Sequence, residues 1–390
     1  MKNDIEWKMV KLGEVCHIGD GLHGTPSNDD LGNFAFFING NNLSNGIINL
    51  SNDTELVSES FFNKHKINFS KRTVFLSING TIGNVALYSN EKIVLGKSVA
   101  YFNIFKDLET NFLYHFFQSD FAKKSFENLL TGTTIKNLGL KGVRALSIPI
   151  PYKNGSPDLE TQKQIAQKLG DMDSLIAAKE KLLAKKRNLK VAAMQKLIKD
   201  KEDENWKKVK IGNYLRVKTG SKNTEDKIDD GKYPLYVRSP IVERINEYTY
   251  DCEAVLTAGD GVGTGKVFHY VNGKFAAHQR VYVISNFTEI DGKYFYYQFS
   301  QNFYDEVMKY TAKSSVDSVR RGMITGMEIA LPFNSDGSPD LIEQRRIASI
   351  LSNMDCEIAA IEKEITKLQK LKTAMMQKMF CFEDSDSSSE

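Results

Sequence analysis

The stretch GSPDLETQKQIAQKLGDMDSLIAAKE at residues 155–180 returns as GSPDLIEQRRIASILSNMDCEIAAIE at residues 337–362. At a constant offset of 182 (337 − 155), residues 155–197 and 337–379 align without a gap and are identical at 23 of 43 positions. A long period that occurs only twice is typical of tandem copies of one unit, not of a solenoid. The sequence therefore predicts a duplicated protein.

The duplication also reaches the segments before each variable region. EWKMVKLG at residues 6–13 resembles NWKKVKIG at residues 205–212, with the only two tryptophans at an offset of 199 (206 − 7). The offset shrinks to 182, so the second variable region is about 17 residues shorter (199 − 182). Each copy thus has constant ends and a variable middle, and two similar units are expected to bind two similar things.

Composition is that of a globular chain with two domains. The 390 residues are 41% apolar and 26% charged, enough for two domains of about 150 residues, each followed by a helix. Four cysteines without CxxC spacing favour a reducing, cytoplasmic setting over a disulfide framework. We find no run of 18 apolar residues and no apolar signal core. The net charge of +3 is too weak to identify a partner, and the acidic, serine-rich residues 383–390 are expected to be disordered.

The variable regions read as strands followed by an aromatic helix. Strands are predicted at residues 73–78, 85–88 and 100–104, and in the second copy at 254–257, 267–270 and 281–284. Helices are predicted at residues 111–129 and 293–310. Their rings, at spacings of two to four, indicate a buried core, with nucleotide stacking as the alternative; they are Phe112, Tyr114, Phe117, Phe121, Tyr294, Tyr296, Phe299 and Phe303.

The repeated GSPDL segment reads as a helix start. Ser156 or Asp158 can cap free backbone amides, and Pro157 is tolerated there. Apolar residues then recur at alternating steps of four and three, which predicts a coiled-coil seam. In the first copy, Lys179 and Lys186 replace Ile361 and Leu368 on this seam.

Each helix alone would expose an apolar stripe, so the two are expected to pack on each other, antiparallel because a domain lies between them. A continuous helix over residues 159–199 would span about 60 Å, more than one turn of DNA at about 34 Å. Such a pair creates a pseudo-two-fold axis that suits duplex DNA.

Two variable domains, each followed by a PDLxxQxxIAxxL helix that ends in Met-Gln-Lys, resemble the specificity subunit of a type I restriction-modification system. The resemblance covers essentially the whole chain, and its motif residues occur twice. They are Pro157, Asp158, Leu159, Gln162, Ile165, Ala166, Leu169 and Asp173, with Pro339, Asp340, Leu341, Gln344, Ile347, Ala348, Leu351 and Asp355.

The resemblance implies an α+β fold with two α/β target recognition domains related by pseudo-two-fold symmetry and separated by two long helices in an antiparallel coiled coil. The implied segments are residues 1–152 and 204–333 for the domains, 153–203 and 334–382 for the helices, and 383–390 for the tail. Each domain would read one half of a split, asymmetric DNA site. The helices would set the spacing and dock two methyltransferase subunits, which restriction and translocase subunits would join.

The resemblance also implies that this chain is not an enzyme and holds no cofactor, while S-adenosylmethionine, ATP and Mg²⁺ belong to partner subunits. The residues agree, because the sequence has no Asp/Asn-Pro-Pro-Tyr motif. The glycine-rich run 259–267 is not a P-loop, since Asp260 stands where a glycine is needed and Val267 replaces the Mg²⁺-binding hydroxyl. No cysteine or acidic cluster recurs at the spacing of zinc ligands, which argues against a zinc site.

Polar loop residues are the candidates for DNA contacts, since bases are read by Arg, Lys, Asn and Gln, and phosphates by hydroxyls and amides. For the glycine-rich runs 79–84 and 259–267, a simple hairpin and a DNA-contacting loop both remain open, as do base contact and loop stabilisation for His23. The first-domain candidates are His23, Thr25, Asn41, Asn42, Asn79, Thr81, Asn84, Lys97, Ser98, Thr133, Thr134 and Lys136. The second-domain candidates are Lys218, Ser221, Lys222, Arg238, Ser239, Thr264, Lys266, Gln279, Arg280, Lys313, Ser314, Ser315, Arg320 and Arg321.

Partner docking is expected on polar residues that recur in both helices, namely Gln162, Asp173, Gln195, Lys196, Gln344, Asp355, Gln377 and Lys378. The alternative function is a stand-alone duplicated DNA-binding or regulatory protein without methyltransferase partners. Co-purification of a subunit that binds S-adenosylmethionine would separate the two hypotheses.

Overall fold

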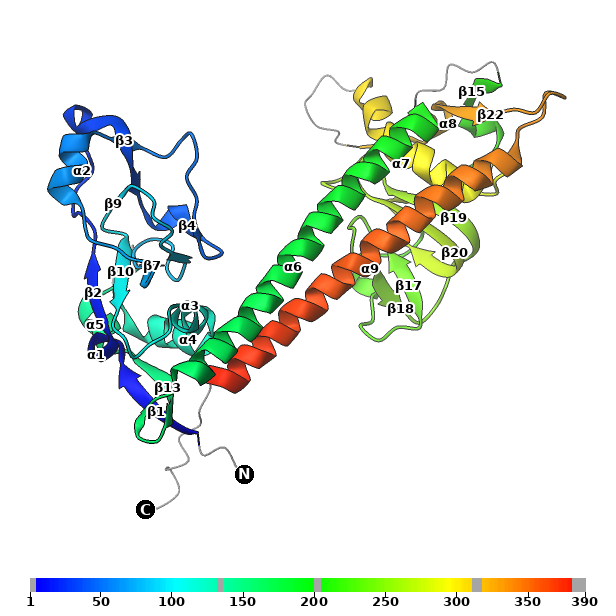
Figure 1. The fold of residues 1–390 in the computed structure, drawn as a ribbon. Coiled ribbons are helices and arrows are strands. Elements are labelled where there is room, and N and C mark those ends of the chain that lie inside the picture. The colour runs from blue at the N-terminus through cyan, green and yellow to red at the C-terminus, as the bar shows by residue number, and fades with distance from the viewer. Residues whose placement is uncertain (1–4, 132–135, 200–204, 311–317, 381–390) are drawn as a thin grey trace. The chain divides into compact units, whose positions relative to one another are not determined.

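The computed structural model describes residues 5–131, 136–199, 205–310 and 318–380. The chain forms two compact units, Met1–Glu180 with Lys363–Glu390, and Lys181–Glu362 (Figure 1). Each long helix is shared between both units. The domain boundaries given above, in which each helix is a segment of its own, therefore stay a prediction. The acidic segment 383–390 lies outside the described residues.

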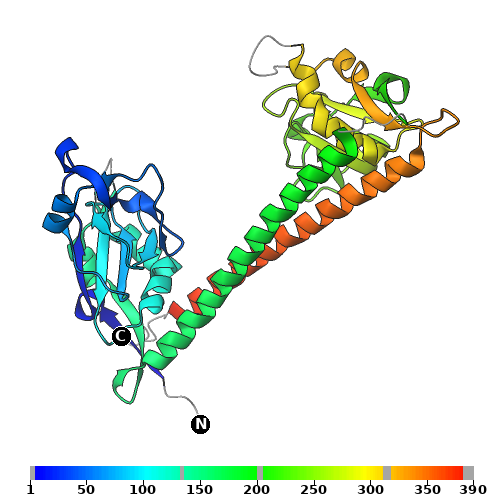
Figure 2. The same cartoon turned by 45° about the horizontal axis from the view of Figure 1, so that its top comes forward.

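The first unit is built around a four-stranded antiparallel sheet in the order β2-β10-β7-β8, with the smaller sheets β6-β3-β9 and β1-β13-β14 (Figures 1 and 2). Phe75, Phe102 and Phe117 are fully buried within it. Its strands are β1 (Glu6–Lys11), β2 (Cys16–Asp20), β3 (Leu31–Ile38), β4 (Leu43–Ser44), β5 (Ile47–Ile48), β6 (Leu56–Val57), β7 (Thr73–Ser77), β8 (Val85–Leu87), β9 (Ile93–Leu95), β10 (Val99–Ile104), β11 (Leu130–Thr131), β12 (Asn137–Leu138), β13 (Ser147–Lys153) and β14 (Ser156–Pro157). Its helices are α1 (Leu12–Val15), α2 (Glu59–His65), α3 (Thr110–Gln118), α4 (Asp120–Leu129) and α5 (Leu140–Ala145).

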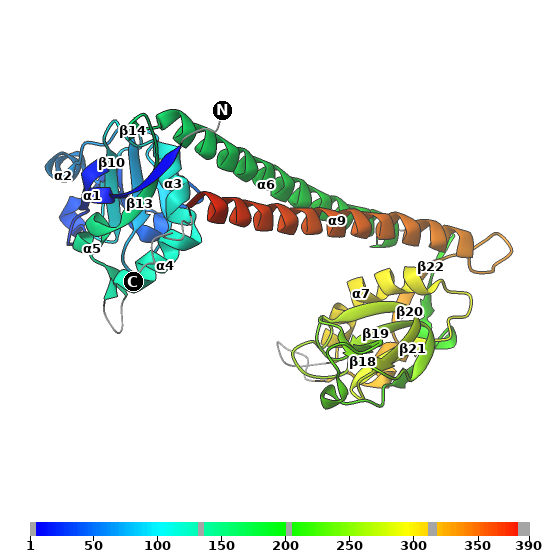
Figure 3. The same cartoon turned by 90° about the horizontal axis from the view of Figure 1, so that it is seen from below.

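The second unit has a six-stranded sheet in the order β16-β21-β19-β20-β17-β18, and α7 packs on β19 and β20 (Figure 3). Its strands are β15 (Trp206–Lys210), β16 (Arg216–Thr219), β17 (Tyr233–Tyr236), β18 (Glu243–Ile245), β19 (Tyr250–Ala258), β20 (Phe268–Ala277), β21 (Val281–Ser285) and β22 (Glu328–Pro332). Its short helices are α7 (Gly292–Met308) and α8 (Arg321–Thr325). All six predicted strands of the two variable regions are present, with ends shifted by up to seven residues.

The predicted helix at 111–129 is in fact two helices, because Ser119 ends α3 and starts α4. Its backbone N–H donates to the Phe116 carbonyl at 2.9 Å, and its Oγ accepts the Ala122 N–H at 3.2 Å. The helix predicted at 293–310 is the continuous α7, with Asp291 as its cap. The aromatic rings of these helices are buried or half-buried, which confirms the core interpretation.

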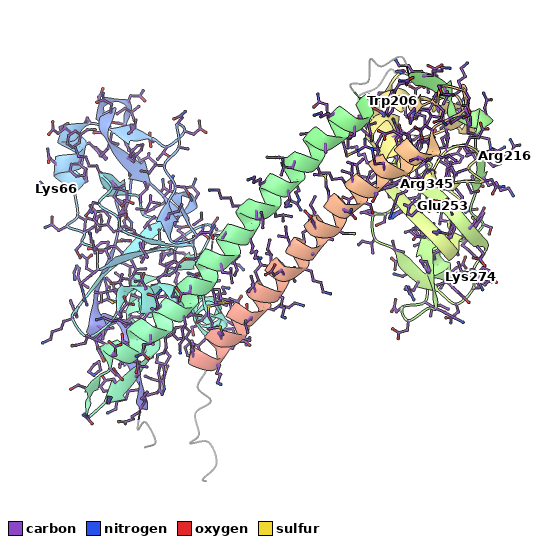
Figure 4. The ribbon with its side chains drawn as sticks, turned by 45° about the vertical axis from the view of Figure 1, so that its right-hand side comes forward. Lys66, Trp206, Arg216, Glu253, Lys274 and Arg345 are labelled. Carbon is purple, nitrogen blue, oxygen red and sulfur yellow. The ribbon has the colours of Figure 1, made fainter. Side chains whose placement is uncertain are left out.

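The constant ends of each unit pair with each other. Trp7 on β1 lies opposite Pro151 on β13, and Trp206 on β15 (labelled in Figure 4) lies opposite Pro332 on β22. The second strand of each pair then leads into the long helix, α6 (Leu159–Met194) or α9 (Leu341–Phe380). Because β1 pairs with β13 and β15 pairs with β22, the constant segments at both ends of a unit are repeated together.

Aspartate, rather than serine, caps the long helices. Asp158 accepts the N–H groups of Glu160 and Thr161 at 3.1 Å, and Asp340 accepts those of Ile342 and Glu343 at 2.9 and 3.0 Å. The hydrogen bond from the Thr161 side chain, together with the two backbone N–H groups, outweighs desolvation and lowers the pKa of Asp158, as expected for a carboxylate at a helix start.

The long helices pair in antiparallel fashion within each unit. In the first unit Ile165 and Leu169 of α6 share a core with Met376 and Phe380 of α9, and in the second Ile347 and Leu351 pack with Met194 and Ile198. The seam lysines contact acids of the opposite helix, Lys179 with Glu364 at 2.8 Å and Lys186 with Glu357 at 2.5 Å. The predicted antiparallel pairing is therefore confirmed within each unit.

Candidate nucleic-acid interface

Three loops meet at one end of the sheet in each unit. In the first unit they are residues 39–42, 78–84 and 96–98, which we call loop cluster 1. The Ile78 N–H donates to the Ser98 carbonyl, and the Gly96 N–H to the Ile38 carbonyl. In the second unit, loop cluster 2 comprises residues 237–241, 259–266 and 278–280. There the Gly259 N–H donates to the Arg280 carbonyl and the His278 N–H to the Tyr236 carbonyl, so both clusters have the same backbone frame.

A fourth loop packs on each cluster through a glycine. Leu22 forms a β-bridge with Gly96, and Lys222 forms one with His278. A Cβ atom at Gly21 would collide with the Leu95 carbonyl oxygen, and one at Gly220 with the Ala277 carbonyl oxygen. The segments around His23 and Ser221 therefore occupy matching places in the two units.

The glycine-rich runs are hairpin loops. Residues 78–84 connect the antiparallel neighbours β7 and β8, and residues 259–267 connect β19 and β20. Gly83 has a φ of +95° and Gly261 a φ of +79°, a left-handed conformation that favours glycine. This confirms the hairpin interpretation, while DNA contact by the same loops stays a prediction.

A further segment joins each hairpin through an isolated bridge. Asn79 pairs with Asn137 in the first unit, and Asp260 pairs with Ser318 in the second. The predicted contact residues Lys136 and Arg320, both exposed, are close in sequence to Asn137 and Ser318, the residues that bridge to the hairpins. The candidates Thr133, Thr134, Lys313, Ser314 and Ser315 lie outside the described residues.

Loop cluster 1 is held by neutral side chains. Ser98 Oγ accepts the Gly40 N–H at 2.9 Å and donates to Asn39 Oδ1 at 2.8 Å. Asn42 Oδ1 accepts the Asn39 N–H at 2.9 Å, and Asn84 Nδ2 donates to the Gly40 carbonyl at 3.2 Å. Three predicted DNA-contact residues, Asn42, Asn84 and Ser98, thus have a structural role in joining the loops.

Loop cluster 2 is held by charges. Asp260 accepts Nη1 of Arg238 on Oδ1 at 2.7 Å and Nη1 of Arg280 on Oδ2 at 2.6 Å. Desolvation raises the pKa of Asp260, but the hydrogen bonds and charges of both arginines outweigh it and leave the pKa below its usual value. The carboxylate therefore stays ionised and orients both guanidinium groups.

The buried side chain of His278 also holds loop cluster 2 in place. It is 6% exposed, and its Nδ1 accepts the backbone N–H of Arg280 at 3.0 Å. Burial and the charge of Arg238 lower the pKa of His278, although Asp260 opposes them. A neutral ring, which this hydrogen bond requires, is thereby favoured.

The other predicted DNA contacts differ in accessibility. Thr264 is a correction: it is 3% exposed and its Oγ1 donates to the Gly261 carbonyl, so it shapes the hairpin and cannot contact DNA directly. Lys222 pairs with Glu247, Gln279 donates to Asn223, Ser239 accepts the Ile241 N–H, Arg321 donates to the Val217 carbonyl, and His23 contacts Asp20 at 2.8 Å. Further exposed candidates are Thr25, Asn41, Thr81, Lys97, Lys218, Ser221 and Lys266.

Sequence reasoning missed two apolar residues of loop cluster 2. Val262, between Gly261 and Gly263, is 98% exposed, and Ile241 is 67% exposed. An apolar residue flanked by two glycines at a hairpin tip was the available signal.

Among the described residues, no group of three or more His, Cys, Asp or Glu side chains could hold a metal ion. Nor is any described helix long and apolar enough to cross a membrane.

Two predicted docking residues are corrected by their burial. Gln162 and Gln344 are both 0% exposed, and their Oε1 atoms accept the N–H groups of Glu109 and Asp291 at 2.9 Å. Each glutamine joins its long helix to the start of α3 or α7. Neither is accessible to a partner subunit.

The repeated aspartates also have partners within their own unit. Asp173 pairs with Lys372 at 2.5 Å beside the buried His115, and Asp355 pairs with Lys190 at 2.5 Å while accepting the Tyr297 hydroxyl at 2.7 Å. Gln377 donates to Asp120, and Gln377, Gln195, Lys196 and Lys378 are all exposed.

Comparisons with known proteins agree with the duplicated architecture. A family model described as Type I restriction modification DNA specificity domain matches residues 4–185 and 203–372. The Type I restriction enzyme EcoDI specificity subunit of Escherichia coli is 29% identical over 171 residues, which are 44% of this chain and only 37% of that subunit. A putative type I specificity subunit of Mycoplasma genitalium is 22% identical over 338 residues, 81% of this chain and 82% of that protein. The crystal structure of a type I restriction-modification S subunit from M. genitalium has a TM-score of 0.69 at 17% identity and covers 98% of both chains, which shows the same fold.

Proposed function

We propose, since the chain belongs to the family of type I restriction-modification DNA specificity domains, that its two units read the two halves of a split, asymmetric DNA sequence. The role of this family is sequence specificity, not catalysis. The proposal places base reading in loop clusters 1 and 2 and their neighbouring loops.

The main support is the pair of loop clusters, which share one backbone frame but differ in their side chains. Cluster 1 presents the exposed amide of Asn41 and hydroxyl of Thr81, whereas cluster 2 presents the guanidinium groups of Arg238 and Arg280. Different polar groups on one frame are expected to prefer different bases. The exposed Lys97, Lys218 and Lys266 can add phosphate contacts that fix the register on the duplex.

The proposal extends to partners. We expect two methyltransferase subunits to dock on equivalent exposed positions of the long helices, including Gln195, Lys196 and Lys378, and restriction or translocase subunits to join them. S-adenosylmethionine, ATP and Mg²⁺ would be bound by those partners. The helices would set the distance between the two DNA halves.

The decisive experiment maps methylated adenines across the genome of a strain that expresses the complete complex. We expect one split sequence, and exchange of residues 1–150 for those of a relative should change only one of its halves. A change of both halves would refute the assignment of one half to each unit. Exchange of residues 383–390 serves as a control that should leave the sequence unchanged.

Partner number is tested separately. Native mass measurement of the purified complex should give two methyltransferase subunits for each copy of this chain. A one-to-one ratio would contradict two equivalent docking faces, and purification of the chain without any methyltransferase would favour a stand-alone DNA binder.

A further inference from the structure

The Arg238–Asp260–Arg280 cluster has a geometry that goes beyond general DNA attraction. Each arginine contacts Asp260 through Nη1 only, at 2.7 and 2.6 Å. A guanidinium group has five N–H donors in a rigid fork, so each retains donors for a ligand. The Arg280 side chain is 60% exposed and the Arg238 side chain 41% exposed, while Asp260 is 22% exposed.

The carboxylate argues against a site made only for phosphate. Asp260 cancels one of the two positive charges and would itself repel a phosphate group. Its benefit is orientation, because a guanidinium held by a carboxylate loses less freedom when it binds a planar, bidentate acceptor. Among bases, guanine offers such an acceptor pair, O6 and N7, in the major groove.

The apolar neighbours support the same conclusion. Val262 is 98% exposed at the hairpin tip and Ile241 is 67% exposed beside Arg238 and Ser239. Exposed apolar side chains gain little beside phosphates, but they can contact thymine methyl groups and base edges inside a groove. Gly261 and Gly263 flank Val262, and a Cβ at Gly263 would collide with the Arg238 carbonyl oxygen, so the hairpin lies tightly against the arginine loop.

We propose that loop cluster 2 reads a guanine through the guanidinium group of Arg280. Asp260 is the positioning residue that orients Arg280, and Arg238 binds the other carboxylate oxygen of Asp260. The proposal rests on the proposed function. It requires a G·C pair in the half-site that residues 204–333 recognise. Loop cluster 1 has serine at the position equivalent to Arg280, because the Ser98 carbonyl accepts the Ile78 N–H just as the Arg280 carbonyl accepts the Gly259 N–H.

The test uses the complete complex with the variants Arg280→Ala, Arg280→Lys and Asp260→Asn. We expect Arg280→Ala to reduce discrimination at one G·C position of the second half-site by roughly 5- to 150-fold. Arg280→Lys should reduce it similarly, since lysine keeps the charge and loses the fork. Asp260→Asn should reduce it less and leave the preferred base unchanged. Methylation of oligonucleotides with each base at each position measures all three.

Arg216→Lys is the matched control. Arg216 is an exposed arginine of the same unit (labelled in Figure 4), and it begins β16 opposite Ser285, at the end of the sheet away from Val281 and loop cluster 2. It should leave discrimination at every position unchanged. Ser98→Ala should leave the second half-site unchanged as well.

Two results would overturn the inference. One is a second half-site without any G·C pair. The other is an Arg280→Ala complex that methylates all sequences more weakly by the same factor, because that pattern identifies a phosphate contact. In either case the parent complex still methylates a split sequence, whereas failure of the proposed function would leave the parent without one.

Discussion

Loop clusters 1 and 2 have the same backbone frame, but neutral side chains join the loops of the first and charged side chains those of the second. In both, a hairpin, a strand end and a strand start are joined by equivalent main-chain hydrogen bonds, and a fourth loop packs on them through Gly21 or Gly220. Hydrogen bonds of the Ser98 side chain join the loops of cluster 1, and ion pairs of Asp260 join those of cluster 2. The difference indicates that the frame is fixed by backbone contacts, which leaves the side chains free to diverge.

The comparison extends to the joints between domain and helix. In both units a lysine and an aspartate pair across the two long helices, but His115 stands beside Asp173 where Tyr297 stands beside Asp355. The repeated ion pair maintains the joint, while the residue next to it differs in its response to pH. Four experiments can break or sharpen these comparisons.

The largest effect should come from breaking the shared frame at its glycines. Gly21→Ala and Gly220→Ala should each destabilise their own unit by about 3 kcal/mol or more, because the added Cβ collides with a backbone carbonyl. Urea unfolding of the full chain measures the loss. Gly24→Ala is the matched control, since nothing lies within 4 Å of its Cβ position. Equal stability of Gly21→Ala and Gly24→Ala would show that the frame does not depend on this contact.

The second experiment sharpens the contrast between His115 and Tyr297. Burial and the charge of Lys372 lower the pKa of His115 from 6.5 to about 4, although Asp173 opposes them. The folded protein therefore binds fewer protons than the unfolded chain between these values. Stability should fall as the pH falls from 6.5 towards 4, with a total loss on the order of 3 kcal/mol.

His115→Gln should remove this part of the pH dependence, as measured by urea unfolding at several pH values between 4 and 7. His115→Tyr, which copies the second unit, should do the same. His23→Gln, at an exposed histidine, is the control. The second unit keeps an acid response of its own, because burial lowers the pKa of His269 and of His278. An unchanged pH profile of His115→Gln would contradict the prediction.

The third experiment compares the buried glutamines. Gln162→Leu and Gln344→Leu should cost about 1–3 kcal/mol each, because each leaves the backbone N–H at the start of α3 or α7 without its acceptor. Thermal unfolding of both variants measures the cost, and Gln167→Leu on the exposed face of α6 is the control. Clearly unequal costs would show that the two joints are less alike than their hydrogen bonds indicate.

The repeated residues allowed most of the fold to be predicted. The family resemblance, the two-domain architecture and the antiparallel helix pairing within each unit are confirmed. The break at Ser119 was missed because the hydrophobic pattern continues across it, and only the hydroxyl bond to the Ala122 N–H starts a new helix. Gln162 and Gln344 were taken for docking residues because repetition alone does not separate a buried joint from an exposed face.

The candidate interface was harder to predict. Sequence patterns found the hairpins and the arginines, but they could not show that residues 238, 260 and 280, far apart in sequence, share one ion-pair cluster. Nor could they show that Asn42, Asn84 and Ser98 are occupied in joining loops. Such assignments depend on which strand ends meet, and that is a property of the tertiary fold.

The smallest effect should come from the seam, where the first helix has Lys179 and Lys186 in place of Ile361 and Leu368. Lys179→Ile removes a bond to Glu364, whose side chain is 47% exposed, and an exposed ion pair contributes about 0–1 kcal/mol. Isoleucine would restore the apolar seam and offset that loss, so the net change in unfolding free energy should stay within about 1 kcal/mol. Lys186→Leu should behave alike, and Lys185→Leu, exposed and off the seam, is the control. A loss above about 2 kcal/mol would mean that these ion pairs fix the register of the helices, as polar residues do in some coiled coils, and that the two copies differ in their helices as much as in their loop clusters.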